Sequence, residues 1–374
     1  MKFDVSSSAL LARLQALSKV ITSKNTLPIL DSFLFHLQDN KLTLTAADVE
    51  TRLVTTVDVM NVEGEGCFAV SAKILLEPLK KFPEQPLTFD INDDNLEIFI
   101  YFENGKYNFI GQKGDSYPQH KPLKDTSFTL VLESQILLNG VTRALFAAGE
   151  DDLRPIMNGI CFDIQLENLT FVASDGHKLV RLRNHSVKSE NTASFVLSKK
   201  PANLLRSLLA KNAESVKIQF DDNNAYVTTE NFQMVCRLIE GRYPNYNSVI
   251  PLDNPNKLTI DRLVFLSALE RVAVFSNPAS SLVKLQLSSD LIVVSAQDID
   301  YSTSAEEKIN CQYGGMDMSI GFKANFLIEM LSNISASEIV LALADPARAG
   351  VIVPAENEEN EELLMLMMPL VLND

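Results

Sequence analysis

LTLTAAD, at residues 42–48, recurs as LTFVASD at residues 169–175 and, more loosely, as LIVVSAQD at residues 291–298. The aspartates that end the three copies stand 127 and 123 residues apart in a chain of 374 residues. A period of about 125 residues has the size of a domain and is far too long for a solenoid repeat. The sequence therefore predicts three similar domains in tandem.

Each copy has the same order of predicted elements. An extended stretch leads into an amphipathic helix, β-like runs follow, and a second helix precedes alternating strands such as residues 87–91, 216–220 and 339–343. The periodicity predicts helices at residues 6–24, 72–82, 134–147, 198–211, 260–276 and 322–332. Hairpin turns belong at Asp93-Asp94-Asn95, Asp221-Asp222-Asn223 and Asp345-Pro346. Each unit is thus a β-rich α+β domain, and Pro78 predicts a short or kinked second helix in the first copy.

The joints between the copies are marked by proline. Tyr117-Pro118 and Tyr243-Pro244 end the first two units, and polar, proline-bearing stretches follow them. Residues before proline avoid the helical conformation, which suits an extended linker. We expect domains at residues 1–123, 124–252 and 253–374.

Composition indicates a soluble globular protein. The chain is 46 % hydrophobic and 22 % charged, and it shows neither a signal peptide nor an apolar run long enough to cross a membrane. A cytoplasmic location is expected. The four cysteines are scattered singly, so we expect buried reduced thiols rather than disulfides, and we predict no metal site and no cofactor.

The net charge of −15 conceals an uneven distribution. The six predicted helices hold 14 lysines and arginines against four acids, so they carry about +10 and the rest of the chain about −25. Helices that share one surface would give an acidic protein a basic lining, which is the electrostatic footprint of polyanion binding. The alternative is that these bases only solvate exposed helix faces.

Catalytic motifs are scarce. The phosphate-binding loop, dinucleotide-binding turn, nucleophile elbow and zinc-protease patterns are all missing from the sequence. The cluster Ser174-Asp175-Gly176-His177-Lys178 could be taken for a nucleophile, an acid and a base. Adjacent residues seldom converge on one reacting atom, and the aspartate recurs in copies that lack the other residues, which favours a turn. Two other hypotheses compete with the binding of a polyanion. One is an enzyme with a small-molecule pocket, and the other is an adaptor that never touches DNA.

Six short stretches carry a family resemblance. They are MKF at 1–3, TLPIL at 26–30, NG at 158–159, SDGHKL at 174–179, GRYPNY at 241–246 and MMPL at 367–370. Together with the threefold organisation, they resemble the bacterial DNA polymerase III beta subunit family, the replication sliding clamps. The resemblance implies a head-to-tail homodimer closed into a ring of six domains, with helices lining the hole and strands outside. It also implies a processivity factor without a catalytic site of its own.

The resemblance implies DNA contacts that do not depend on base sequence. It assigns Lys24 and Lys73 to DNA binding, and Lys199 and Lys200 join them from the predicted basic helices. The family often has an amide and aromatic residues around positions 151–156, whereas this chain has acids, proline and isoleucine there. Arg154 is the one candidate for DNA contact in that stretch.

The resemblance also implies a groove for short linear peptides of partner proteins. The partners are the polymerase III alpha subunit, the clamp loader, other polymerases and repair proteins, with no membrane involved. The matching positions are Met157, Ser174, Gly176, His177, Lys178, Leu179, Pro244, Val249, Leu366, Met367, Met368, Pro369, Leu370 and Leu372. Ser248 and Val371 stand where the family commonly has arginine, and Asn373-Asp374 extends beyond the usual end. The alternative for residues 363–372 is a final core strand.

The ring joint is implied at two places in the sequence. Tyr107 and Phe109, on a strand of the first domain, would meet Val274 and Phe275, at the end of a helix in the third domain of the partner protomer. Such a heterologous interface must close by symmetry or it would polymerise.

Overall fold

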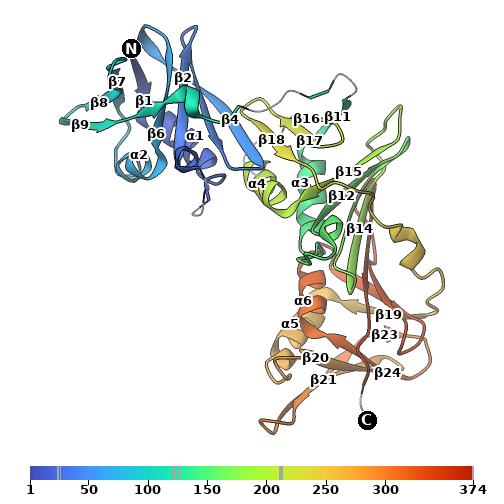
Figure 1. Ribbon diagram of the computed structural model, residues 1–374. Helices are drawn as coiled ribbons and strands as arrows, with labels where there is room; N and C mark the ends of the chain where they lie inside the picture. The colour runs from blue at the N-terminus through green and yellow to red at the C-terminus, as the bar shows by residue number, and fades with distance from the viewer. Residues whose placement is uncertain (23–24, 26, 120–122, 125–126, 210–213, 373–374) are drawn as a thin grey trace. The chain divides into compact units, whose positions relative to one another are not determined.

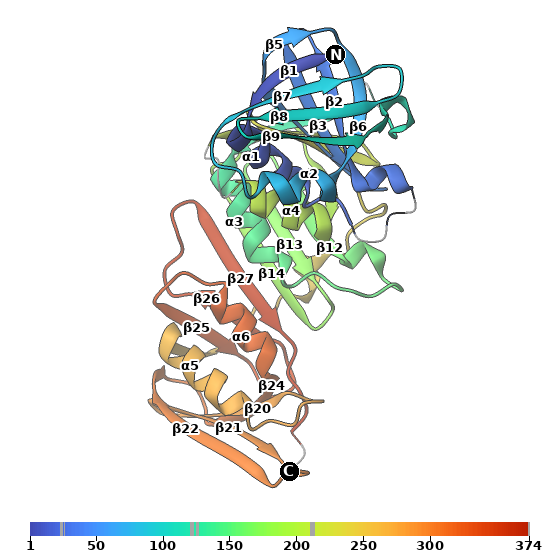
Figure 2. The ribbon, with the colours of Figure 1, turned by 90° about the vertical axis from the view of Figure 1, so that its left-hand side faces the viewer.

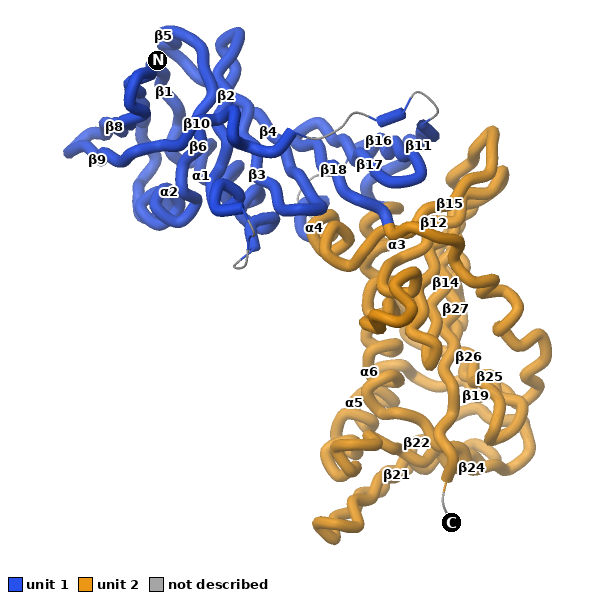
Figure 3. The backbone as a smooth tube through the Cα atoms, in the orientation of Figure 1, with its two compact units in different colours: residues 1–135, 207–238 blue, residues 136–206, 239–374 orange. Residues whose placement is uncertain are grey.

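The computed structural model describes residues 1–22, 25, 27–119, 123–124, 127–209 and 214–372. It divides into two compact units (Figure 3). Unit 1 comprises residues 1–135 and 207–238, and unit 2 comprises residues 136–206 and 239–374. The middle sequence repeat therefore contributes to both units, and each unit is described by itself.

Unit 1 contains two antiparallel sheets (Figure 1). The smaller has the order β5 (Met60–Glu63), β1 (Lys2–Ser6), β7 (Pro86–Ile91), β8 (Glu97–Phe102), β9 (Gly105–Ile110). The larger has the order β10 (Gln112–Lys113), β6 (Gly66–Ser71), β2 (Ser32–Gln38), β3 (Lys41–Ala47), β4 (Thr51–Asp58), β18 (Gln233–Arg237), β17 (Asn224–Thr228), β16 (Ser215–Phe220), β11 (Phe128–Glu133). The ring centroids of Phe35 on β2 and Phe89 on β7 lie 6.1 Å apart, so the two sheets share one buried aromatic core.

Two helices cover this core. Helix α1 (Ser7–Leu17) buries Leu10, Leu14 and Leu17, and the Ser6 hydroxyl caps it by accepting the Ala9 N–H at 3.1 Å. Helix α2 (Ala72–Leu79) contains Pro78 and ends one residue later. The prediction of a short second helix is confirmed.

Unit 2 also contains two antiparallel sheets. The smaller has the order β22 (Thr303–Asn310), β21 (Leu291–Asp298), β20 (Leu282–Ser288), β24 (Met318–Lys323). The larger has the order β15 (Ala193–Ser198), β12 (Gly159–Ile164), β13 (Leu169–Ser174), β14 (Lys178–Asn184), β27 (Glu361–Met367), β26 (Gly350–Pro354), β25 (Glu338–Leu343), β19 (Asn256–Asp261), β23 (Gln312–Tyr313). Most of α3 (Ser134–Leu145) and α4 (Lys199–Leu209) belongs to this unit, together with α5 (Arg262–Ala273) and α6 (Ala324–Ser332). Figures 1 and 2 both place α5 beside α6.

Each nine-stranded sheet joins strands of two consecutive repeats. In unit 1, β4 of the first repeat pairs with β18 of the second, and in unit 2, β14 of the second repeat pairs with β27 of the third. Mixed helices and antiparallel sheets in three repeats confirm the predicted α+β fold. The boundaries at residues 123 and 252 stay a prediction, and the first falls between stretches outside the described residues.

Candidate DNA and peptide interfaces

The predicted DNA-contacting bases differ in their surroundings. Lys24 lies outside the described residues. Lys73 is exposed in the first turn of α2. Lys199 and Lys200 open α4 and are half-buried, and the Lys199 ammonium lies 2.9 Å from an oxygen of Glu150. Lys73 is therefore more accessible to a phosphate than Lys199.

Several other helical bases are engaged within the protein. Arg143 on α3 lies 2.8 Å from Glu361 and 2.5 Å from Glu358, with only 13 % of its side chain exposed. Arg271 binds both carboxylate oxygens of Glu307, at 2.8 and 2.6 Å. Counting charges along the helices therefore overestimates the positive charge available to DNA.

Arg154 lies against the turn at residues 174–178 instead of projecting freely. Its Nε donates to Asp151 Oδ2 at 2.9 Å, and one Nη donates to the Asp175 carbonyl at 3.5 Å. A Cβ placed on Gly176 would lie 2.8 Å from the other Nη. Arg154 thus adjoins the predicted peptide groove, and its role in DNA contact stays a prediction.

The polar side chains of the turn at residues 174–178 form hydrogen bonds to the main chain of the same turn. Asp175 Oδ1 accepts the backbone N–H groups of His177 and Lys178 at 2.8 and 2.9 Å, and the Ser174 hydroxyl donates to the Lys178 carbonyl at 2.8 Å. Asp48 accepts two backbone N–H groups of its own turn in the same way. Gly176, at φ +90, takes the left-handed conformation that favours glycine. The repeated aspartate is therefore a turn residue, as predicted.

An apolar cluster lies on one face of the larger sheet of unit 2. We call it the β14–β27 cluster. It consists of buried Cys161, Val172, Leu179, Val196, Ala349 and Leu366, with Ile156, Ile239, Tyr243, Tyr246, Ile250 and Leu364 packed against them. Leu179 and Leu366 are direct cross-strand partners, and Met368 N–H donates to the His177 carbonyl at 2.8 Å. The structure thus brings together the predicted groove residues 174–179 and 366–368.

The remaining predicted groove residues lie around this cluster or away from it. Met157 follows Ile156 in a short 3-10 helix (Pro155–Met157), and Pro244 and Val249 flank the packed tyrosines 243 and 246. Pro369 precedes Leu370, which pairs with Gly321 of β24, and Leu372 lies over the same glycine. Lys178 and Met367 face each other in the ladder one residue from Leu179 and Leu366, so their side chains point to the opposite face.

Several buried residues of the β14–β27 cluster were not predicted from the sequence. Cys161 and Val172 sit on strands whose apolar alternation looks like an ordinary core. Cys161 is a buried free thiol, and burial raises its pKa to about 12, whereas Cys67 and Cys311 are only half-buried, contrary to the expectation of buried thiols. The Tyr246 hydroxyl donates to Asp163 at 2.6 Å, and burial is the main cause of its raised pKa. Among the described residues, no group of three or more metal-ligating side chains occurs.

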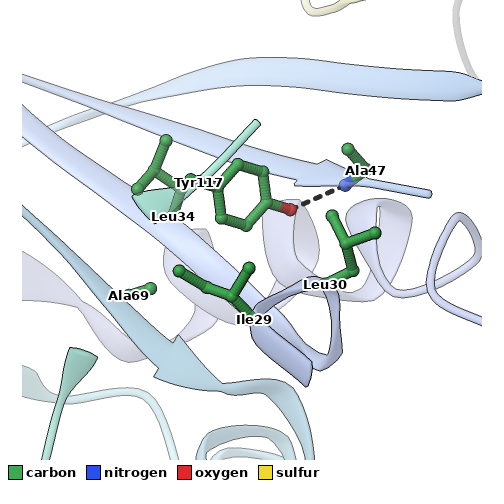
Figure 4. Packing of buried hydrophobic residues seen from close by; sticks show 6 residues of the cluster. All are labelled: Ile29, Leu30, Leu34, Ala47, Ala69 and Tyr117. Carbon is green, nitrogen blue, oxygen red and sulfur yellow. Dashed lines mark hydrogen bonds between the residues drawn. The ribbon is translucent and has the colours of Figure 1, made fainter. Parts of the chain in front are cut away.

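The first repeat contains a matching cluster, shown in Figure 4. It consists of Ile29, Leu30, Leu34, Ala47, Ala69 and Tyr117. Tyr117 is 3 % exposed, and its hydroxyl accepts the Ala47 N–H at 2.8 Å. Arg52 stands 127 residues before Leu179, which is the spacing between the first two repeats, so the two residues hold equivalent positions. The Arg52 guanidinium donates to the Pro118 carbonyl at 3.4 Å. The chain's own linker residue Tyr117 is buried in this cluster, whereas Ile156, Tyr243 and Tyr246, which pack against the β14–β27 cluster, are only half-buried.

The residues of the predicted ring joint lie in two exposed apolar features, and their role in a joint stays a prediction. In unit 1, Tyr107 and Phe109 lie on the edge strand β9 and line a cavity of about 210 Å³. Its other lining residues are Ile74, Leu75, Pro78, Leu79, Phe82, Ile100 and Asn108. In unit 2, Val274 and Phe275 follow α5 and are 78 % and 39 % exposed. An apolar cavity and a partly exposed aromatic side chain are complementary in chemistry.

Comparison with known proteins accounts for the repeats. Sequence profiles of the DNA polymerase III beta subunit match the chain in order: the N-terminal domain at residues 1–121, the central domain at 131–245 and the C-terminal domain at 247–368. The beta sliding clamp of Pseudomonas putida is 26 % identical over 368 residues, covering 98 % of this chain and 100 % of that protein. The beta sliding clamp of Bacillus subtilis is 22 % identical over 380 residues, covering 99 % of both.

Solved structures agree in fold over the whole chain. A crystal structure of the DnaN sliding clamp of Pseudomonas aeruginosa bound to griselimycin matches with a TM-score of 0.94 at 24 % identity, covering 100 % of both chains. The DNA polymerase III beta subunit of Thermotoga maritima matches with a TM-score of 0.90 at 24 % identity and the same coverage. No helix in the described part of the chain is long and apolar enough to span a membrane. Because the three family profiles follow one another along the three repeats, the chain belongs to the DNA polymerase III beta subunit family, and its function is that of a sliding clamp of DNA replication.

Proposed function

We propose that two copies of this chain close head to tail into a ring around duplex DNA. The observation that carries this proposal is the pair of complementary apolar features, the cavity beside Tyr107 and Phe109 and the partly exposed Phe275. Because the two features occur on different parts of one chain, they support a heterologous joint, and we propose that this joint closes with two subunits. The domains of each copy would be residues 1–123, 124–252 and 253–374.

A closed ring is held on DNA by topology, so its residence depends on whether the DNA has ends. We expect the clamp, once loaded on nicked circular DNA with a clamp loader, to co-elute with that DNA on gel filtration. Cutting the circle with a restriction enzyme should release it. Retention that does not change on cutting would contradict encirclement and favour an adaptor or a tight conventional DNA-binding protein.

The DNA-facing residues would be Lys24, Lys73, Lys199 and Lys200, with Arg154 as a further candidate. These basic side chains would contact DNA phosphates without reading the nucleobases, which lets the ring slide. Lys199 is held by Glu150, so part of its charge is already neutralised.

This ion pair gives a test by substitution. Replacing all four lysines with alanine should lower the slope of log K against log salt by roughly one unit for each lost phosphate contact. Glu150→Gln has nearly the same shape and releases Lys199, so it should raise the slope, by roughly one unit at most. Fluorescence anisotropy with a short duplex at several salt concentrations gives both slopes. An unchanged slope in the fourfold variant would refute the basic lining.

The second activity we propose is capture of client proteins by a short apolar peptide. The β14–β27 cluster would take the apolar side chains of that peptide, while Met157, Val249 and Met368 would border it. Apolar burial against this cluster and its half-buried neighbours would give affinity without strict sequence specificity. The clients would be the polymerase III alpha subunit, the clamp loader and other polymerases and repair proteins. Ser248 and Val371, in place of arginines, would shift the preference among peptides.

We also propose that the chain has no catalytic site and acts in the cytoplasm without a cofactor. The strongest catalytic candidate was the segment Ser174 to Lys178. Its aspartate and serine are occupied by backbone hydrogen bonds, and the exposed His177 ring has no contact with either of them among the hydrogen bonds of the described residues.

A further inference from the structure

Asp163 lies one row of the sheet beyond the β14–β27 cluster, on the same face. It follows Cys161 by two positions on β12, so the two side chains share a face about 7 Å apart. Its cross-strand partner is Thr170, which pairs in turn with Arg183 of β14. The sheet face therefore changes from apolar to polar at this row, directly beside the cluster.

Both oxygens of the Asp163 carboxylate accept hydrogen bonds. Oδ2 accepts the Tyr246 hydroxyl at 2.6 Å, and Oδ1 accepts Gln165 Nε2 at 2.6 Å. Arg183, in the same row, donates to Glu362 at 3.1 Å instead. Hydrogen bonds to a carboxylate are roughly twice as strong as bonds between neutral groups, and they are directional. The half-buried Tyr246 ring is therefore fixed at its hydroxyl as well as by apolar packing.

Tyr246 opens the short 3-10 helix that carries Val249. The helix spans Tyr246–Val249, and Ser248 donates both its main-chain N–H and its hydroxyl to the Asn245 carbonyl, at 3.2 and 2.7 Å. Tyr246 packs against the cluster, whereas Val249 is 58 % exposed. The three steps between them span about 6 Å in a 3-10 helix. A shift of Tyr246 would therefore also move Val249, a border of the proposed peptide site.

We infer that Asp163 is a positioning residue for client-peptide binding. By holding the Tyr246 hydroxyl, it fixes the connecting segment at residues 244–249 beside the cluster, without touching the peptide itself. The inference rests on the proposed peptide-binding function and adds to it a residue of β12, outside the stretches that form the proposed groove. An ordered border raises affinity because the peptide then does not have to order it on binding.

The experiment removes each end of this hydrogen bond in the full-length chain. Tyr246→Phe removes only the hydroxyl, and Asp163→Ala removes the carboxylate. Each should weaken binding of a fluorescein-labelled peptide from the C-terminal tail of the organism's replicative polymerase by about fivefold, mainly through faster dissociation. The double variant should lose about fivefold rather than twenty-fivefold, since both changes break one hydrogen bond. Asp163→Asn keeps an acceptor oxygen and should bind within about twofold of the wild type.

Gln165→Met is the matched control. It removes the hydrogen bond to the other oxygen of the same carboxylate and leaves the Tyr246 bond in place. Its peptide affinity should equal that of the wild type. Hydrogen–deuterium exchange of the free protein gives a second measurement: amides of residues 244–249 should exchange faster in Tyr246→Phe and Asp163→Ala than in Gln165→Met.

The outcomes separate the inference from the proposed function. Weaker binding in Tyr246→Phe, with Asp163→Ala like the wild type, would mean that the hydroxyl touches the peptide directly, and would overturn the inference. Faster exchange with unchanged affinity in both variants would overturn it as well, because the hydrogen bond would then order the segment without serving the peptide. A wild-type chain that fails to bind the peptide would instead refute the proposed function.

Discussion

Phe275→Asp converts the proposed dimer into monomers at nanomolar concentration. The Phe275 side chain is 39 % exposed in the single chain, and the cavity proposed to receive it is lined by apolar side chains such as Leu79 and Phe82. An aspartate there would be buried without a partner charge, which costs about 3–5 kcal/mol. That cost raises the dissociation constant by roughly a hundredfold to a few thousandfold for each joint, and a closed ring of two subunits has two joints. Mass photometry over a dilution series measures it.

A matched control comes from the other end of the same helix. Leu263 is 57 % exposed at the start of α5, so Leu263→Asp makes the same kind of change away from the proposed joint. It should leave the dimer intact. If Phe275→Asp and the wild type dissociate at the same concentration, the joint has been placed on the wrong residues.

The turns of this fold could be predicted from the sequence because their chemistry is local. Asp48 and Asp175 accept backbone N–H groups two and three residues ahead, so the motif that repeats along the chain also contains its own hydrogen-bond partners. Pro78 limits α2 for a similarly local reason, since it lacks the N–H that a longer helix interior would use.

Partners distant in the sequence could not be predicted in this way. Arg143 looked like a base available to DNA, but its partner Glu361 is 218 residues away and no spacing in the sequence reveals it. Lys178 belonged to a motif assigned to the groove, yet β-strand alternation turns its side chain to the other face. Spacing predicted the order of helices and strands along each repeat, whereas the environment of each charge depended on the tertiary fold.

Leu179→Asp should abolish capture of the client peptide while the dimer persists. Leu179 is 3 % exposed in the centre of the β14–β27 cluster, opposite Leu366. A carboxylate there would face the apolar side chains of the bound peptide, which costs about 2 kcal/mol or more and lowers affinity by roughly thirtyfold or more. Fluorescence anisotropy with the polymerase tail peptide measures the loss, and mass photometry measures the dimer. Truncation is a poorer test when it begins at Met367, because that side chain is fully buried in the core.

Two further variants distinguish a loss of peptide binding from misfolding of the protein. Val249 is 58 % exposed, so Val249→Asp should weaken binding of the peptide without lowering the melting temperature of the protein. Leu252, in the same connecting segment, is fully exposed and does not belong to the cluster, so Leu252→Asp should bind peptide like the wild type. Peptide binding that survives both Leu179→Asp and Val249→Asp in a folded dimer would remove the β14–β27 cluster from client recognition. The ladder from Glu361 to Met367 would then be only a closing core strand, because burial alone accounts for its apolar residues.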